Sequence, residues 1–388
     1  MNTVYISHFF SSCLYQKKIA GIAARGVNVT GISPPCWIDE GRKQCFEPGP
    51  SGNVISIPAY FIGSGSLYFF KPLALARALR RLNADVIHID EEPWSLACLE
   101  VLILRWLLFR RSTLLFDSSE NLDKAIPFPF SAVERLMFAC ASAATAISEE
   151  VKARLKKRGF RKPVEVVGHG VDLQDYPTYG KGPARREQRL DDAFTIGYVG
   201  IVARRKGVFV LLEAFRQAHL PAARLVFVGS GEALEELKVA AASDVFLSSR
   251  VRFLDPVPHS GIPRLLPALD VLVLPSLTTP RWKEQFGRIL IEAMASRVAL
   301  IGSDSGGIPG VLGDAGIVVP EGDAGALAAV LGRLATDEAE LQRLSERSLE
   351  RVQRHFTWSA VSRQVTELYE SCVPKGGPVC KEGIAGAR

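Results

Sequence analysis

The chain of 388 residues lacks several features that would place it in a specialised class of protein. Its seven cysteines are odd in number and scattered, with no CxxC pair, which argues against a disulfide framework or a zinc site and favours a reducing cytoplasm. The most apolar run, residues 95–111, contains Glu100 and Arg105 and falls short of the roughly 20 residues that a membrane span needs, so a buried helix is expected there. The first ten residues show no basic segment or cleavage site, and no signal peptide is expected.

Negative charge is scarce in the first half of the chain. Residues 1–189 hold 25 Lys and Arg against 18 Asp and Glu (+7), whereas residues 190–388 hold 22 against 23 (−1). The basic excess gathers on apolar helical patterns at 71–82 and 151–162. These are either solvated faces of amphipathic helices or a surface that contacts an anionic membrane, which would put the protein at its inner face. Nucleic acid is not expected as a partner, because neither stacking aromatics nor a helix-turn-helix signature accompanies the charge.

What is present is a repeated alternation of strand and helix patterns. In the first half, β-rich runs occur at 3–7, 27–33, 54–58, 85–89, 113–117, 144–148 and 164–168. In the second half they occur at 194–200, 224–231, 251–255, 271–276, 298–304 and 316–320. Helical patterns lie between them, which predicts an α/β protein with two Rossmann-like, doubly wound parallel sheets. Such sheets bind ligands at the carboxyl ends of their strands, so a central cleft between the two domains is the expected active site.

The length agrees with two domains of somewhat under 200 residues. We expect an acceptor-side domain over 1–172 and a linker over 173–192, where Gly, Pro and charge interrupt the periodicity. A donor-binding domain over 193–357 should follow. The helix pattern at 358–371 is expected to return to the first domain, and the tail 372–388 to be disordered.

Residues 283–307 hold two glutamates, a Phe-Gly break, an apolar helix, a strand and a double glycine. The loop before Phe286 opens at the ligand edge of the sheet, and the next helix start offers unpaired N–H groups to an anion such as a diphosphate. In a helix, Glu284 and Glu292 would lie roughly 12 Å and about 80° apart, too far to hold one atom. They suit the two polyol ends of one elongated molecule, such as a sugar nucleotide.

A structural explanation exists for each charged group. Glu284 could serve only the electrostatics of a helix end. Glu292 sits in the apolar run ILIEAMA, where an unpaired carboxylate is costly, so a partner is expected. The basic trio Arg204, Arg205 and Lys206 could be a solvated turn, but it directly follows the end of a strand.

The stretch EQFGRILIEAMAS followed by SDSGGIP resembles the E-x7-E region of retaining glycosyltransferases of family 4, which have the GT-B fold. The stretch 196–215 is similar to the first strand, glycine-rich loop and helix of that family's donor domain. GHGVD at 168–172 is similar to its domain-exit motif. The resemblance covers about residues 3–371 and is more specific in the second half.

This resemblance implies a role for each matching residue. Glu292 would hold the ribose hydroxyls, Glu284 the hydroxyls of the donor sugar, and Lys206 with Arg205 the diphosphate. Phe286 and Gly287 would place backbone amides near the sugar and diphosphate. The remaining implied donor-binding residues are Gly200, Arg204, Gly229 and Arg288. No metal and no cofactor is expected, because the nucleoside diphosphate sugar is itself a substrate, and cations and amides can stabilise the leaving diphosphate.

The chain departs from the family pattern on the donor side. Ile201 follows Gly200 where the family often has an arginine, for which Arg204 or Arg205 could compensate. Arg297 takes the place of a glycine after the helix, which would cost on the order of 1–2 kcal/mol in a left-handed cap. Gly310 replaces a common glutamate.

On the acceptor side, no glycine-rich loop follows the first strand, and the histidine usual after TLLFD is missing. Either Asp117 or Glu120 takes its place, or the role is absent. The acidic cluster HIDEEPWS at 88–95 allows helix capping, acceptor binding through Asp90 and Glu91, or metal ligation. For His169 and His259 a structural hydrogen bond is the simpler expectation.

The sequence therefore predicts a cytoplasmic, metal-independent, retaining hexosyltransferase. It would move a sugar from a nucleoside diphosphate sugar to a hydroxyl acceptor, for which the basic first half favours a lipid-linked or cell-surface glycan precursor. Two alternatives stay open: a catalytically silent relative that binds a nucleotide sugar or a partner protein, and a nucleotide-sugar epimerase. A dinucleotide-dependent enzyme is disfavoured, because the chain lacks G-x-G-x-x-G.

Overall fold

The computed structural model describes residues 1–39, 42–49, 53–109, 111–176 and 180–373. Packing divides the chain into two compact units. The first unit contains residues 1–117 and 128–144 and the described residues from 363 onward. The second contains residues 118–127 and 145–362.

The first sheet has seven strands in the order β11-β10-β9-β8-β1-β2-β5. Their bounds are β1 Asn2–Ser7, β2 Asn28–Ser33, β5 Val54–Ser56, β8 Val86–Asp90, β9 Thr113–Ser118, β10 Ala143–Ala146 and β11 Val164–Val166. β1 pairs in parallel with β2 and β8, and β8 with β9. β8 and β9 are buried almost throughout, as strands covered on both faces must be.

Helices connect these strands. They are α1 Cys13–Ala23, α2 Pro72–Leu82, α3 Leu96–Leu108, α4 Phe130–Cys140 and α5 Glu149–Lys157. The apolar run at 95–111 forms the expected helix α3, but the helix is only partly buried, because Ile103, Trp106 and Leu107 are 48%, 60% and 58% exposed. Among the described residues, no helix has both the length and the apolar character needed to cross a membrane. Two short antiparallel hairpins were not expected: β3 Cys36–Asp39 with β4 Arg42–Cys45, and β6 Ala59–Tyr60 with β7 Phe69–Phe70.

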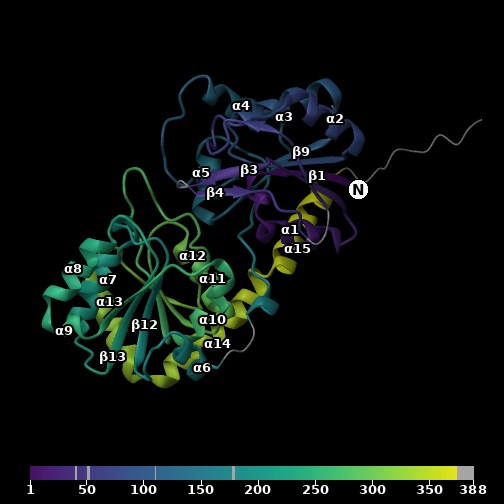
Figure 1. Ribbon diagram of the computed structural model, residues 1–388. Helices are drawn as coiled ribbons and strands as arrows, with labels where there is room; N and C mark the ends of the chain where they lie inside the picture. Colours follow the sequence, from purple (N-terminus) through teal and green to yellow (C-terminus); the bar gives the residue numbers. More distant parts are fainter. Residues whose placement is uncertain (40–41, 50–52, 110, 177–179, 374–388) are drawn as a thin grey trace, which may run out of the picture. The chain divides into compact units, whose positions relative to one another are not determined.

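The second sheet has six parallel strands in the order β14-β13-β12-β15-β16-β17. Their bounds are β12 Phe194–Val199, β13 Ala223–Val228, β14 Val251–Leu254, β15 Val271–Leu274, β16 Ala299–Ser303 and β17 Ile317–Val319. In Figure 1 these strands lie between one group of helices with α7, α8 and α13 and another with α10, α11 and α14. This order brings the ends of β12, β15 and β16 together at one edge.

The helices of this part surround that sheet. They are α6 Lys181–Glu187, α7 Val208–Ala218, α8 Leu234–Ser243, α9 Val245–Ser248, α10 Ile262–Leu265, α11 Arg288–Ala295, α12 Ile308–Leu312, α13 Ala324–Thr336 and α14 Glu338–His355. The last described helix is α15 Trp358–Cys372. The long α14 was not expected from the sequence. The doubly wound pattern of two parallel sheets is otherwise the one that the alternation predicts.

The expected linker at 173–192 is partly helical. A 3-10 turn covers Leu173–Asp175, and α6 is part of the second unit, where Arg185 forms a buried ion pair with Asp270 at 2.6 Å. Residues 177–179, and the tail from 374 onward that was expected to be disordered, lie outside the described residues. α15 is shared between the units, since its residues up to 362 belong to the second and the rest to the first. The domain boundaries at 172 and 192 stay a prediction.

Candidate active site

Glu284 lies at the carboxyl edge of the second sheet and is held by two partners. Its Oε2 accepts hydrogen bonds from Lys206 Nζ at 2.7 Å and from Ser276 Oγ at 2.8 Å. Lys206 comes from the turn after β12, and Ser276 from the loop after β15. The carboxylate is 7% exposed, so the lysine supplies the cation that a buried charge needs. The structure therefore brings together Glu284 and Lys206, both expected in the site; Ser276 was missed.

The backbone around Glu284 is fixed by a close approach of two glycines. Its carbonyl oxygen accepts hydrogen bonds from Gly307 N and from Asn121 Nδ2, both at 2.9 Å. Gly306 has φ +57°, and a Cβ there would lie 1.9 Å from the same oxygen. The double glycine of the sequence thus lets one backbone pack directly on another.

Glu292 is the second buried carboxylate of this part, on α11. Its Oε1 accepts hydrogen bonds from His259 Nε2 at 2.9 Å and from Arg288 Nε at 2.8 Å. Burial opposes ionisation, but the hydrogen bond from His259 and the charge of Arg288 outweigh it and lower the pKa of Glu292. The partner expected for this glutamate exists. His259, for which only a structural hydrogen bond was expected, is one of them.

Phe286 and Gly287 precede α11. Gly287 is the N-cap residue with φ +79°, a left-handed conformation that glycine adopts without strain. The Phe286 ring is 4% exposed and packs edge-on against His169 and Phe356. At the start of the helix, these two residues can therefore contact a ligand only through their backbone, whose N–H groups can bind an anion.

The three basic residues of the turn after β12 do not all make the same contacts. Arg205 and Lys206 lie over the Trp282 ring, with their cationic groups 5.2 and 4.5 Å from its centroid. Arg204 instead forms an ion pair with Glu236 of α8, and both side chains are mostly exposed. Gly200 and Gly229 adopt positive φ and pack together, since a Cβ on Gly229 would lie 1.9 Å from Gly200 O. Arg204, an expected donor-binding residue, thus pairs with α8 and not with Glu284.

In the first unit, Asp117 belongs to a buried network. Its carboxylate accepts hydrogen bonds from His88 Nε2 at 2.8 Å and from Tyr5 Oη at 2.9 Å. Burial alone would raise the pKa of Asp117, but the charges of His88 and Lys18 lower it. Burial and the nearby Asp117 carboxylate together raise the pKa of Asp90 well above its ordinary value. Of these two acids, Asp90 is therefore the one that more readily holds a proton.

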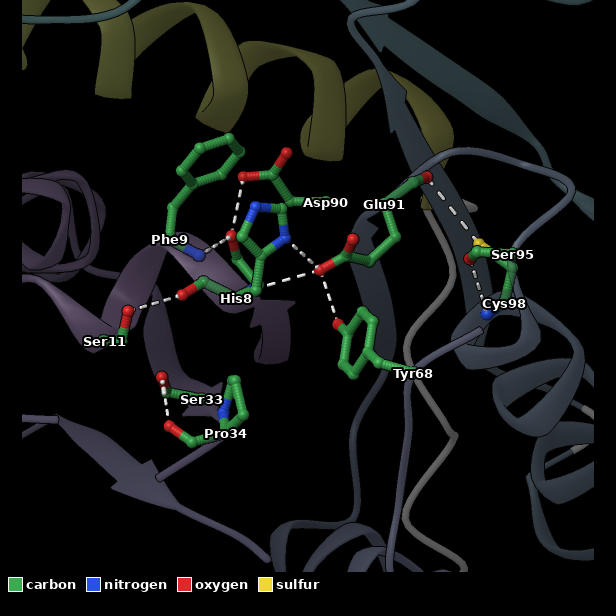
Figure 2. Close-up of polar contacts among 11 residues, drawn as sticks. His8, Phe9, Ser11, Ser33, Pro34, Tyr68, Asp90, Glu91, Ser95 and Cys98 are labelled. Atoms are coloured by element: carbon green, nitrogen blue, oxygen red, sulfur yellow. Dashed lines mark hydrogen bonds and ion pairs between the residues drawn. The ribbon is translucent and has the colours of Figure 1, made fainter. Parts of the chain in front are cut away.

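Glu91 is the other buried acid at this edge (Figure 2). Its Oε1 accepts hydrogen bonds from His8 Nδ1 at 2.7 Å, from His8 N at 3.1 Å and from Tyr68 Oη at 2.5 Å. The stretch 88–95 does cap α3, but through Ser95, whose side chain accepts from Cys98 N, and not through one of its acids. The sequence reading missed His8 and Tyr68, although His8 directly follows β1.

Glu120 makes separate contacts from those of the other three acids. It forms an ion pair with Lys124 and accepts from Leu122 N at 3.0 Å. Within the described part of the chain, no group of three or more His, Cys, Asp or Glu side chains is arranged to hold a metal ion.

Comparisons with known proteins agree with this architecture. The family model described as glycosyl transferases group 1 matches residues 182–351, and the model described as glycosyltransferase family 4 matches residues 19–175. Sucrose-phosphate synthase from Thermosynechococcus elongatus has a similar structure, with a TM-score of 0.71 at 22% identity over 95% of this chain and 98% of that one. Anabaena HepE, crystallised with UDP, gives a TM-score of 0.73 at 18% identity over 96% and 100%. The fold is GT-B.

The chain is also similar in sequence to several glycosyltransferases. The phosphatidyl-myo-inositol mannosyltransferase of Mycobacterium leprae is 32% identical over 352 residues, 85% of either chain. The D-inositol 3-phosphate glycosyltransferase of Corynebacterium urealyticum is 31% identical over 232 residues, 55% of this chain. The chain spans about half the length of the first relatives it matches, 53% for this one and 46% for a mannosyltransferase of Mycolicibacterium smegmatis. The chain belongs to the GT-B glycosyltransferases of family 4.

Proposed function

We propose that this glycosyltransferase moves a hexosyl group, with retention and without a metal, from a nucleoside diphosphate sugar to a hydroxyl acceptor. The observation that carries the proposal is the pair of buried, cation-paired glutamates beside the start of α11, Glu284 with Lys206 and Glu292 with Arg288. The diphosphate would lie at the helix start and against Lys206 and Arg205. Glu284 would hold the sugar hydroxyls and Glu292 the ribose hydroxyls.

In the proposed reaction, the bond from the anomeric carbon to the diphosphate breaks and its electron pair leaves on the phosphate oxygen. The acceptor oxygen forms the new bond on the same face of the sugar and gives its proton to that leaving oxygen. Negative charge therefore grows on the diphosphate in the transition state. Lys206 is 16% exposed, so its charge acts there with little screening by water.

The experiment is a thermal-shift screen with UDP, GDP, ADP and their sugar conjugates, followed by an assay for nucleotide release. Binding to the folded state raises the melting temperature. Glu284→Ala should abolish sugar transfer, while Glu235→Ala on the exposed face of α8 is the matched control. Transfer by the purified protein would exclude a silent relative, and products formed without acceptor would identify an epimerase. Unimpaired transfer by Glu284→Ala would overturn the role of this glutamate.

We further propose that the acceptor is linked to a lipid. Exposed side chains on two helices of the first unit support this. Exposed apolar side chains lie on α2 and α3, with Leu73 68%, Trp106 60% and Leu107 58% exposed. Exposed Arg80 and Arg81 lie at the end of α2. Exposed apolar and basic groups on α2 and α3 suit an anionic lipid surface.

We expect the protein to sediment with vesicles that contain phosphatidylglycerol more than with phosphatidylcholine vesicles. Trp106→Ser should weaken that binding several-fold, because an interfacial aromatic side chain is lost. Equal sedimentation of the variant and the native chain would contradict a membrane role for α3.

A further inference from the structure

His8 and Glu91 are placed side by side by the register of the first sheet. β1 and β8 run parallel, with Ser7 opposite Asp90, so the next residue of each strand lies just beyond the same carboxyl edge. Open α/β sheets bind ligands at that edge. The two side chains come from sequence positions 83 apart and form one hydrogen-bonded pair.

The hydrogen bonds around Glu91 determine which nitrogen of the His8 ring carries a proton. One carboxylate oxygen accepts from the His8 amide, the Tyr68 hydroxyl and His8 Nδ1, and the Glu91 side chain is 2% exposed. Because a carboxylate only accepts, Nδ1 must carry a proton, and in the neutral ring Nε2 keeps its lone pair. Among the described residues, Nε2 has no hydrogen-bond partner, and the His8 side chain is 15% exposed.

Aromatic rings hold the imidazole in place. The centroids of Phe9 and Trp37 lie 4.0 and 4.1 Å from that of His8, and Tyr68 packs edge-on against Trp37. Trp37 belongs to the β3–β4 hairpin, and Tyr68 directly precedes β7, so both unexpected hairpins support this ring. A ring fixed by packing and by a second hydrogen-bonded group is preorganised for a ligand.

Resting on the proposed function, we infer that His8 binds the acceptor: its Nε2 accepts a hydrogen bond from a hydroxyl of a neutral polyol ring, either a sugar or a cyclitol. Glu91 and Tyr68 are positioning residues that act through His8. A phosphate or carboxylate is disfavoured at this point, because the buried Glu91 carboxylate would repel it.

The first test uses the full chain labelled with 15N-histidine and long-range proton–nitrogen NMR spectra. His8→Gln identifies the His8 signals among those of the six histidines. We expect the tautomer with the proton on Nδ1, and signals of Nε2 that shift when methyl α-mannopyranoside or myo-inositol is added. Inositol 1-phosphate should shift them at least about tenfold less readily, because like charges oppose its approach.

Glu91→Gln should weaken polyol binding by about tenfold, since the side-chain amide no longer selects one tautomer. The opposite tautomer in the native chain would overturn the inference. So would His8 signals that no neutral polyol moves, or that the phosphate moves as readily.

A second test separates this inference from the proposed function. Where a donor is turned over, His8→Gln should lower kcat/KM for the acceptor about 10- to 100-fold and leave the nucleotide thermal shift unchanged, because only an acceptor hydrogen bond is lost. His355→Gln, at the end of α14, is the matched control and should change neither value. Absence of any nucleotide binding would defeat the proposed function, whereas the NMR result would still decide the role of His8. Unchanged acceptor kinetics in His8→Gln would defeat the role of His8 alone.

Discussion

At the residue scale, the second unit contains two buried glutamates, and in each of them one carboxylate oxygen accepts hydrogen bonds from two donors. Glu284 joins Lys206 to Ser276, and Glu292 joins Arg288 to His259. A buried charge without such partners would cost several kcal/mol. Under the proposed function, sugar and ribose hydroxyls would bind to carboxylates that these partners already hold in place.

The lowered pKa of Glu292 makes a prediction about pH. Its folded-state pKa lies below the unfolded value of about 4.3, so the ionised group stabilises the fold fully above that pH. The contribution is lost as pH falls through the folded-state pKa. The difference in free energy of unfolding between the native chain and Glu292→Gln should therefore shrink below about pH 4.3, as measured by urea unfolding.

His259→Gln should reduce that same pH-dependent difference, because His259 provides the first of the hydrogen bonds that lower the pKa. A difference that stays constant down to the acid transition would show that the Glu292 carboxylate is not held in this way.

At the element scale, the start of α11 depends on the double glycine that follows β16. Gly306→Ala would put a methyl group 1.9 Å from Glu284 O in a left-handed backbone, so the loop must move. We expect a loss of sugar transfer of about 100-fold or more, since a shift of about 1 Å in a positioned group is that costly. Gly310→Ala on α12 is the control, because its Cβ would meet no atom within 4 Å. Equal activity of the two variants would contradict the geometric argument.

The end of α11 gives a stability prediction. Arg297 follows the C-cap residue with φ +57°, the left-handed conformation that the sequence comparison suggested and that glycine adopts more readily. Arg297→Gly should raise the free energy of unfolding by about 0.5–1 kcal/mol through relief of strain. Arg297→Ala keeps the strain and should not, so calorimetry on both variants separates the backbone from the side chain.

Elements with strong periodicity were predictable, and those without it were not. Buried strands such as β8 and β15 are short apolar runs after helices, and the sequence places them within a residue or two. The β3–β4 hairpin escaped because its strands are four residues long and β4 reads RKQC. α14 could have been found, since Asp337 caps the helix and accepts a hydrogen bond from Glu340 N.

The same limit applies to the candidate site. Glu284 and Glu292 could be predicted from their spacing in the sequence, and Lys206 from its position just after a strand. His8 and Glu91 are 83 positions apart, and their pairing depends on which strands become neighbours in the sheet. Arg204 was expected to bind the donor because it precedes Arg205 and Lys206 in the sequence. Its ion pair with Glu236 of α8 could not be predicted from that position.

At the scale of the whole molecule, the first unit is completed by a distant segment. Tyr369 of α15 is fully buried, and its hydroxyl lies 2.8 Å from His88 Nδ1, which belongs to β8. His88 in turn stacks on Tyr5 of β1 at 4.3 Å. The core of this unit therefore includes side chains from both ends of the described chain.

Tyr369→Phe should lower the free energy of unfolding of the first unit by about 1 kcal/mol, because it removes one buried hydrogen bond without opening a cavity. Calorimetry or urea unfolding would measure this, and Glu370→Gln on the exposed side of α15 is the control. A Tyr369→Phe variant as stable as the native chain would show that His88 finds another partner.

The bond between Tyr369 and His88 also bears on synthesis by the ribosome. Its two residues are 281 positions apart, and the whole six-stranded sheet is translated between them. The strands that are made earlier therefore lack the Tyr369 hydroxyl as a hydrogen-bond partner for His88 until α15 has been translated. During that interval the later part of the chain can finish folding first, and the unfinished sheet is where a chaperone would have most to protect.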